Sequence, residues 1–333
     1  MKTLGIETSC DETAVAVVED GAVRSNLIAS QTDLHARFGG VVPEVAARAH
    51  VEALNPLLDE ALERAETRFS DLDGVAVTVG PGLVGALLVG MAAAKTVALA
   101  AGLPFVGVNH LEGHIWANFL EHGPPEPPYV CLLVSGGHTM LVHMPEIHRH
   151  EVLGQTVDDA AGEAFDKIAR FIGLGFPGGP ALDKLARGGD PGAISFPRAM
   201  IDSGDYDFSL SGLKTAVLRH VKGERDAGRD VDLADLAASF QEAIVDVQVT
   251  KTIAAAREKR VDTVLLGGGV VANTRLRERI EKDGAEAGLR VLFPSMALCT
   301  DNGAMIAAAG ASRLARGERT SFDIPADPGM ELR

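Results

Sequence analysis

Two histidines four residues apart are the part of this sequence best suited to metal chemistry. His110 and His114 lie in the segment GVNHLEGHIWAN, residues 107–118. On a helix this spacing puts both imidazoles on one face, with Cβ atoms roughly 5–6 Å apart. Two neutral imidazoles at that separation can bind one transition-metal ion, and one distant carboxylate would complete a facial ligand set.

The order of these residues differs from the HExxH pattern of zinc proteases. Glu112 follows His110 by two positions, so on a helix it points away from the face that the histidines share. A hydrogen-bonded or solvated histidine pair is an equally good interpretation of the segment alone. The position of the histidine pair favours a ligand site. The strand-like residues 104–108 lead directly into the pair, and open α/β sheets bind ligands at the carboxyl ends of strands.

The composition is that of a globular α/β protein with a core rich in small aliphatic residues. The chain has 333 residues, enough for two lobes, with 46% hydrophobic and 5% aromatic residues. Lys and Arg number 31 against 46 Asp and Glu, a formal charge of −15. Nucleic-acid binders are usually basic, so any contact with RNA requires a local basic patch or a partner's surface. The candidates for such a patch are Arg48, Lys214, Arg275 and Arg277.

Cysteine usage and hydropathy indicate a cytoplasmic protein without membrane association. Cys10, Cys131 and Cys299 are widely spaced, as expected for reduced thiols. Glu7 interrupts the amino-terminal segment before an apolar signal region of sufficient length can form. The longest apolar stretch, residues 83–108, is interrupted by Lys95 and by a Gly-Leu-Pro sequence, which predicts a buried helix followed by a strand.

The chain repeats one plan, a strand, a small polar turn and a second strand. The first copy covers residues 4–18 and the second covers residues 129–143, where the turn has the sequence VSGGHT. Such turns leave backbone N–H groups at their tips, which suits an anion, although an ordinary polar turn is the alternative for the first. A proline-rich segment at residues 123–128 marks the lobe boundary. The expected lobes are 1–128 with about 301–333, and 129–300.

Three further segments could hold a nucleoside or complete the metal site. Asp183 is expected in the first turn of a helix over 181–187, where it would bind ribose hydroxyls or compensate the helix dipole. Asn273 follows a glycine-rich strand end at 267–269, where a flat ring could press against the backbone. Asp301 lies near the start of a C-terminal helix, with helix capping as its alternative role.

In their order and spacing these motifs resemble, over nearly the whole chain, the universal family that installs threonylcarbamoyl on tRNA adenosine, long described as glycoproteases. The residues that carry the resemblance are 6–13, 80–82, 109–114, 134–139, 162–167, 176–180, 211–215, 267–273 and 301–302.

The resemblance implies the two-lobed α/β fold of actin, sugar kinases and heat-shock ATPases, with a duplicated ribonuclease-H-like lobe and a central nucleotide cleft. The family's metal ligands fall on His110, His114 and Asp301, with Fe2+ favoured and Zn2+ as the alternative. Its relatives in archaea and eukaryotes place a tyrosine ligand where this chain has Leu133, which argues against a phenolate ligand here. The family's substrate and nucleotide contacts fall on Leu133, Val134, Ser135, Gly136, Gly137, Asp166, Gly179, Asp183 and Asn273.

The activity implied is transfer of threonylcarbamoyl from an adenylate to a tRNA adenosine, with Glu12 or Asp11 as proton acceptor. An adenine nucleotide, as threonylcarbamoyl-AMP, ATP or ADP, would occupy the cleft. The expected partners are tRNA, a shorter TsaB-like paralogue and a small TsaE-like P-loop ATPase. A small-molecule kinase, an O-carbamoyltransferase, a metallopeptidase and an actin-like scaffold are the alternatives.

Overall fold

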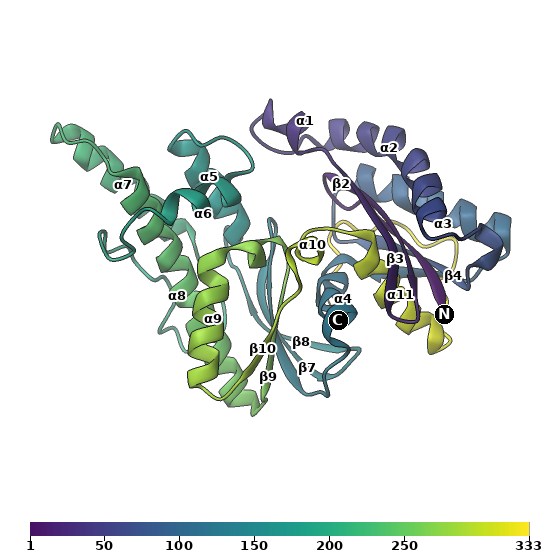
Figure 1. Cartoon of the computed structure of the whole chain (residues 1–333). Helices are drawn as coiled ribbons and strands as arrows, with labels where there is room; N and C mark the ends of the chain where they lie inside the picture. The colour runs from purple at the N-terminus through teal and green to yellow at the C-terminus, as the bar shows by residue number, and fades with distance from the viewer. Residues whose placement is uncertain (333) are drawn as a thin grey trace. The chain divides into compact units, whose positions relative to one another are not determined.

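The computed structural model describes residues 1–332, which form two compact units. The first unit contains Met1–Pro125 and Pro294–Leu332, and the second contains Glu126–Phe293. The sequence placed the corresponding boundaries after residue 128 and near residue 301, a few residues further along the chain in both cases. Figure 1 labels the helices and strands of both units.

The first unit is built on one five-stranded sheet. Its strands are ordered β3-β2-β1-β4-β5, with β1, β2 and β3 antiparallel and with β4 and β5 parallel to β1. The strands are β1 Lys2–Glu7, β2 Glu12–Glu19, β3 Ala22–Ser30, β4 Gly74–Gly80 and β5 Phe105–Asn109. The helices are α1 Thr32–Ala36, α2 Pro43–Arg64, η1 Phe69–Asp71, α3 Val84–Ala101, α4 His110–His122, α10 Met296–Cys299 and α11 Gly303–Ala315.

The second unit repeats this plan. Its strands are ordered β10-β9-β6-β7-β8, again with three antiparallel strands and two parallel strands beside the first of them. The strands are β6 Tyr129–Val134, β7 Thr139–Glu146, β8 Arg149–Gln155, β9 Thr263–Gly267 and β10 Arg290–Leu292. The helices are α5 Ala161–Phe171, α6 Gly178–Ala186, α7 Ser211–Asp226, α8 Leu233–Lys259, η2 Gly269–Ala272 and α9 Thr274–Glu286. The predicted duplicated α/β fold is therefore confirmed.

The most apolar helix of the first unit packs into its core. By length and composition alone α3 could cross a membrane, and it is the one helix of residues 1–332 that could, with a mean hydropathy of 1.8. Leu87, Met91 and Ala94 on this helix belong to the hydrophobic core of the unit. Gly102, at φ +65°, ends the helix, and β5 follows. The prediction of a buried helix and then a strand is confirmed.

Helix α11 lies against the sheet of the first unit with its backbone almost touching a strand. A Cβ atom on Gly5 in β1 would lie 2.3 Å from Gly303 O and 2.5 Å from Ala307 N. A Cβ on Gly310 would likewise lie 2.2 Å from the Cβ of Ala76 in β4. Glycine is therefore required on both sides of this contact, because any side chain would push the helix off the sheet. The contact also fixes the residues just before α11, including Asp301.

We expect Gly5→Ala to destabilise the first unit. The added methyl group cannot fit without moving α11, and such overpacking costs about 1–3 kcal/mol. Gly223→Ala is the control, because a Cβ on Gly223 in α7 would meet no atom within 4 Å. The control should leave the free energy of unfolding unchanged or raise it by up to about 1 kcal/mol. Denaturant unfolding of the two variants measures both effects, and equal stabilities would contradict the proposed contact.

Candidate functional site

Three possible metal ligands converge in the first unit. His110 is the first residue of α4, whose N-cap Asn109 accepts a hydrogen bond from Leu111 N at 2.8 Å. The rings of His110 and His114 have centroids 4.7 Å apart. Asp301 Oδ1 lies 3.5 Å from His110 Nε2 and 3.2 Å from His114 Nε2. The ligand atoms of the three residues all lie within 4.8 Å of one another.

The chemistry of this set fits a divalent transition metal. Both ring nitrogens of His114 are buried, and neither makes a hydrogen bond within the described residues, although Nε2 lies in ion-pair range of Asp301 Oδ1, at 3.2 Å. A buried polar atom without such a bond costs about 1–3 kcal/mol, and coordination of a cation by Nε2 would remove that cost for this atom. Two imidazoles and one carboxylate are a ligand combination that iron and zinc both accept. The assignment of these residues as ligands stays a prediction.

The buried carboxylate of Glu7 holds His110 in place. Glu7 is the last residue of β1 and is 0% exposed, and its Oε2 lies 2.9 Å from His110 Nδ1. The same carboxylate accepts hydrogen bonds from Ser9 N and from Thr78 Oγ1. With Nδ1–H donating to Glu7, the lone pair of Nε2 faces Asp301, and a carboxylate behind a ligand histidine is a common way to orient it. Sequence analysis missed this role, although Glu7 is a charged residue ending an apolar strand.

The charges around His110 favour a cation there. Burial opposes a positive charge on His110, but the carboxylates of Glu7 and Asp301 outweigh it and raise the pKa of His110 to about 9. Burial also opposes ionisation of Glu7, yet the neighbouring His110 keeps the pKa of Glu7 below its ordinary value. Without a metal, a proton on His110 therefore balances the acids, and a metal ion would replace this proton.

The proposed proton acceptors lie where the turn after β1 leads into β2: Asp11 is in the turn and Glu12 is the first residue of β2. Burial, with the negative charges of Asp301 and Asp11, raises the pKa of Glu12 to about 9. His50 Nε2 lies 2.9 Å from Cys10 O and so supports this turn from α2. A carboxyl group with that pKa is protonated at neutral pH and donates a proton. Glu12 can act as an acceptor only when a nearby cation lowers its pKa.

Glu112 lies off the face that the histidines share and has a separate role. Its side chain is 1% exposed and forms an ion pair with Arg313, with Oε2 and Nη2 2.5 Å apart. This buried pair joins α4, which carries the histidines, to α11. Glu112 therefore helps to hold together the two helices at the candidate metal site.

In the second unit, the predicted phosphate loop follows β6. Ser135 N donates to His138 O at 2.8 Å, and Gly162 N in α5 donates to Ser135 O at 3.2 Å. A Cβ on Gly162 would lie 2.7 Å from Gly136 Cα, so the loop rests directly on the start of α5. The glycines of the loop, Gly136 among them, are exposed, whereas Leu133 is 1% exposed and packs in the core. A ligand of this loop would therefore meet the backbone of Gly136 and Gly137.

The predicted position of Asp183 within its helix is wrong. Helix α6 begins at Gly178, where Asp166 Oδ1 accepts a hydrogen bond from Gly178 N at 2.7 Å, and Gly179 is its second residue. Asp183 is in the middle of α6 rather than in its first turn. Its Oδ1 accepts hydrogen bonds from the backbone N and the hydroxyl of Thr274, at 3.2 and 2.8 Å. The carboxylate thus compensates the N-terminus of α9 and not that of its own helix.

Asn273 lies beside Thr274 and caps α9. Its Oδ1 accepts a hydrogen bond from Leu276 N at 2.9 Å, and its Nδ2 donates to Gln241 Oε1 at 2.7 Å. Gly268, at φ +99°, precedes it, and a Cβ there would lie 2.4 Å from Val134 O. The structure therefore brings Asp183, Asn273 and the glycine-rich strand end into one region, and it joins that region to the end of β6.

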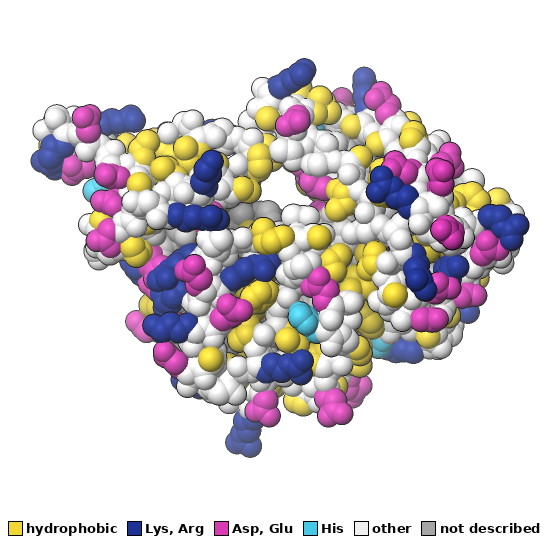
Figure 2. All heavy atoms as spheres, in the orientation of Figure 1, with side chains coloured by type: hydrophobic (Ala, Val, Ile, Leu, Met, Phe, Trp, Pro, Cys, Tyr) yellow, Lys and Arg dark blue, Asp and Glu magenta, His cyan; other side chains and the backbone are white. Residues whose placement is uncertain are grey.

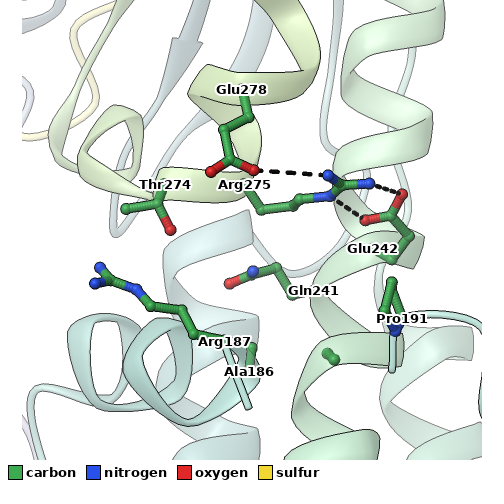
Figure 3. Close-up of a pocket in the computed structure, with 9 residues that line it drawn as sticks. Ala186, Arg187, Pro191, Gln241, Glu242, Thr274, Arg275 and Glu278 are labelled. Atoms are coloured by element: carbon green, nitrogen blue, oxygen red, sulfur yellow. Dashed lines mark hydrogen bonds and ion pairs between the residues drawn. The ribbon is translucent and has the colours of Figure 1, made fainter. Parts of the chain in front are cut away.

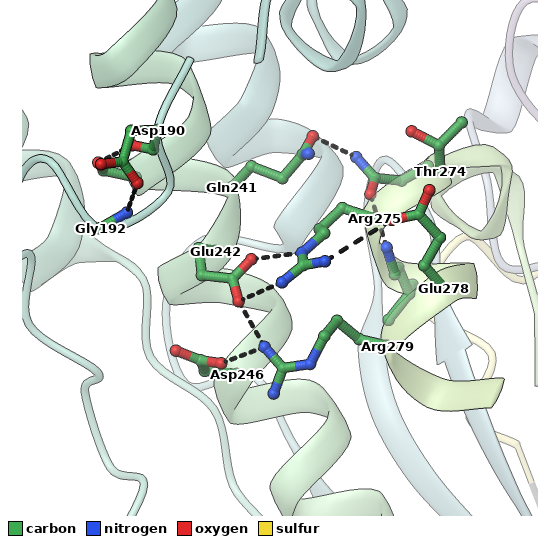
Figure 4. Close-up of polar contacts among 12 residues, drawn as sticks. Asp190, Gly192, Gln241, Glu242, Asp246, Thr274, Arg275, Glu278 and Arg279 are labelled. Atoms are coloured by element: carbon green, nitrogen blue, oxygen red, sulfur yellow. Dashed lines mark hydrogen bonds and ion pairs between the residues drawn. The ribbon is translucent and has the colours of Figure 1, made fainter. Parts of the chain in front are cut away.

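A cavity of about 360 Å³ opens among α6, α8 and α9 in this region (Figure 3). The polar side chains that line it are Arg187, Gln241, Glu242, Thr274, Arg275 and Glu278. Arg275 is held by Glu242 through two hydrogen bonds of 2.6 and 2.9 Å, and Gln241 accepts from Asn273 (Figure 4). The cavity thus has fixed donors and acceptors on its walls, as a binding site for a polar ligand requires.

We expect Glu7→Gln to weaken metal binding without unfolding the protein. The amide keeps the size of Glu7 but loses the charge that orients His110, and loss of such a supporting group typically costs 10–100-fold in affinity. Titration with Co2+ against a competing chelator gives the affinity, and the visible absorption of bound Co2+ reports its ligands. Unchanged affinity and an unchanged spectrum would refute the role assigned to Glu7.

Metal binding at pH 7.5 should release protons from the protein. The Glu12→Gln variant should release about one proton fewer on binding metal than the unaltered protein does. The pKa of Glu12, about 9 without metal, means that this carboxyl carries a proton that a nearby divalent cation would expel. Calorimetric titration in two buffers of different ionisation enthalpy measures the number of protons. Equal proton release from both proteins would show that the bound ion does not lower the pKa of Glu12.

Comparisons with known proteins agree with this architecture. The family model of TsaD, tRNA N6-adenosine threonylcarbamoyltransferase, matches residues 22–308. Relatives with that name from Clostridium perfringens and Clostridium botulinum are 51% and 52% identical over 330 residues, 99% of this chain and 97% of theirs.

HypF from T. kodakarensis shares the fold, with a TM-score of 0.67 at 15% identity over 95% of this chain and 48% of HypF. Component A of the (R)-2-hydroxyglutaryl-CoA dehydratase of Acidaminococcus fermentans does so with a TM-score of 0.55 at 18% identity over 95% and 99% of the two chains. The chain belongs to the TsaD family of tRNA N6-adenosine threonylcarbamoyltransferases.

Proposed function

We propose that this chain transfers the threonylcarbamoyl group of threonylcarbamoyl-AMP to the N6 amine of adenosine 37, beside the anticodon, in tRNAs that read codons beginning with A. A carbon–nitrogen bond to N6 forms as the bond from the carbonyl carbon to the phosphate oxygen breaks, N6 loses a proton, and AMP leaves. The observation that carries the proposal is the identity of about one half, over nearly the full length, with relatives named for this reaction.

The second unit would hold the adenylate. Backbone N–H groups of the exposed Gly136 and Gly137 are suited to the phosphate, because fixed dipoles stabilise negative charge without reorganising. Asp183 and Asn273, supported by Gly179 and Asp166 at the start of α6, would orient the nucleoside. The polar walls of the neighbouring cavity support this assignment, since Thr274 bonds to Asp183 and Gln241 to Asn273.

The first unit would hold the metal, on His110, His114 and Asp301. A bound Fe2+, or Zn2+ as the alternative, supplies a Lewis acid for the acyl carbonyl or an anchor for the threonyl group. Glu7 orients His110 through Nδ1. Glu12, or its neighbour Asp11, would accept the proton that N6 loses, provided that a cation lowers the pKa of Glu12.

The proposed reaction also implies partners and a compartment. A separate enzyme must supply the adenylate, because this chain is assigned the transfer step alone. A shorter TsaB-like paralogue and a small TsaE-like P-loop ATPase would assist it in the cytoplasm. The family resemblance supports the assignment of these two partners. The family name itself gives tRNA as the substrate.

We expect His110→Ala and His114→Ala to lose metal binding and tRNA modification together, because each removes one of three ligands. Metal content is measured by elemental analysis. Activity is measured by incubating the protein and its partners with the adenylate and unmodified tRNA, followed by nucleoside mass spectrometry. Glu60→Gln is the control, since Glu60 lies on the surface of α2 in an exposed ion pair. Full modification by a metal-free double variant would overturn the metal assignment.

The same assay tests the function itself. The unaltered protein with its partners should convert adenosine to threonylcarbamoyladenosine and release AMP in equal amounts. A kinase or small-molecule carbamoyltransferase of this fold would instead consume ATP or carbamoylate a small substrate, with tRNA unchanged.

A further inference from the structure

The basic residues that the sequence pointed to for RNA contact are largely engaged within the protein. Lys214 Nζ forms an ion pair with Asp159, and Arg275 is paired with Glu242. Arg277 lies 4.5 Å from the ring centroid of Phe293 and donates to Val271 O. Arg48, on α2, is exposed. The positive charge that an acidic chain needs for a polyanion must therefore come mainly from other residues.

Helix α7 carries the densest set of available cations. Arg219, Lys222 and Arg225 are all exposed, and none of the three forms an ion pair with a carboxylate among residues 1–332. Glu224, the acid beside them, is neutralised by Arg229 through contacts of 2.6 and 2.7 Å. Asp226, at the end of the helix, is the one exposed acid of α7 without such a partner among the described residues.

The end of α7 projects from the second unit and is not required by its core. The helix packs through a stripe of buried residues that ends at Val221, and the following residues 222–226 continue the helix without a buried side chain. Figure 1 shows α7 running outward from its unit, and Figure 2 shows Lys and Arg side chains together with Asp and Glu side chains at the projecting end, at the upper left. A helix that extends beyond its own packing is available to another molecule.

The spacing of the three cations suits a nucleic-acid strand. They recur every third residue, so at about 1.5 Å of rise per residue they cover about 9 Å along the helix. A strand places one phosphate per roughly 3.4 Å of axis, so this length corresponds to two or three phosphates. Helix-dipole compensation explains Arg225, in the last turn, but it fades within that turn and does not explain Arg219 or Lys222.

We infer that the exposed face of α7 around Arg219, Lys222 and Arg225 binds the phosphate backbone of the tRNA substrate. The inference rests on the proposed function, because that function requires an acidic chain to bind a polyanion. Contacts of this kind position the RNA without reading its sequence. Removing these contacts should therefore lower the affinity for tRNA without changing the binding of the metal or of the adenylate.

The test neutralises the three cations together in the protein assembled with its partners. Arg219→Ala/Lys222→Ala/Arg225→Ala should weaken binding to unmodified tRNA roughly tenfold or more at low salt. The slope of log K against log salt concentration should become less steep by about 2–3, or about 1 for each phosphate that the variant no longer neutralises. Metal content and binding of the adenylate should not change.

A matched variant controls for total charge. Arg257→Ala/Lys282→Ala/Arg290→Ala removes three exposed cations from other parts of the same unit and should leave the slope as it is. An unchanged slope in the α7 variant, with the unaltered protein still modifying tRNA, would overturn the inference and leave the proposed function standing. If the unaltered protein forms no modified nucleoside, the proposed function fails and the inference with it.

A membrane surface is the other polyanion that a basic helix can bind. Sedimentation with phosphatidylserine vesicles separates the two. Vesicle binding that depends on the three α7 cations, together with unchanged tRNA binding, would overturn the inference. Absence of vesicle binding, with the predicted change in the tRNA slope, would support it.

Discussion

Acidic side chains gathered around two buried imidazoles are the feature on which the first unit depends. Glu7, Glu12 and Asp301 all influence the charge state of this region, and two of them contact His110. Like charges in a buried site repel strongly, so the arrangement requires a compensating positive charge. Without metal, protons on His110 and Glu12 supply it, and both have pKa values of about 9. A divalent cation would supply it instead, with His110 as a ligand and with Glu12 ionised and able to accept a proton.

Packing of the backbone creates this site from distant parts of the chain. The histidines follow β5 directly, whereas Asp301 arrives from the C-terminal segment just before α11. Gly5 and Gly310 let α11 approach the sheet closely, and the buried pair of Glu112 and Arg313 ties it to α4. The candidate ligand set thus depends on a helix-on-sheet contact that tolerates no side chain at Gly5 or Gly310.

The two units use one topology for different chemistry. In each, the turn after the first strand of the sheet lies beside the candidate site. In the first unit that turn carries Asp11 and is followed by Glu12 at the start of β2, and in the second it carries the exposed glycines 136 and 137. An acidic turn beside histidines suits a cation and proton transfer, while a glycine turn suits a phosphate. Duplication followed by a change of turn residues explains how one fold supplies both.

Helical spacing was sufficient to predict the shared face of His110 and His114, because it depends on neighbours in sequence. The repeated strand–turn–strand layout indicated two related lobes, and the family resemblance supplied the fold of each. The convergence of Asp301 with the histidines was expected from family resemblance, since no local pattern encodes a contact over that separation. The position of Asp183 was wrong because α6 begins three residues before the predicted start, with Asp166 accepting from its first N–H group. The role of Glu7 and the pairing of Lys214 and Arg275 depend on tertiary contacts that spacing does not reveal.

One divalent cation is expected to bind where His110, His114 and Asp301 meet. A crystal structure of the metal-loaded protein, with anomalous diffraction measured at the metal's absorption edge, tests it most directly. We expect a single ion about 2.0–2.2 Å from His110 Nε2, from His114 Nε2 and from an oxygen of Asp301. An ion bound elsewhere, or one bound through His110 Nδ1 with Glu7 displaced, would contradict it.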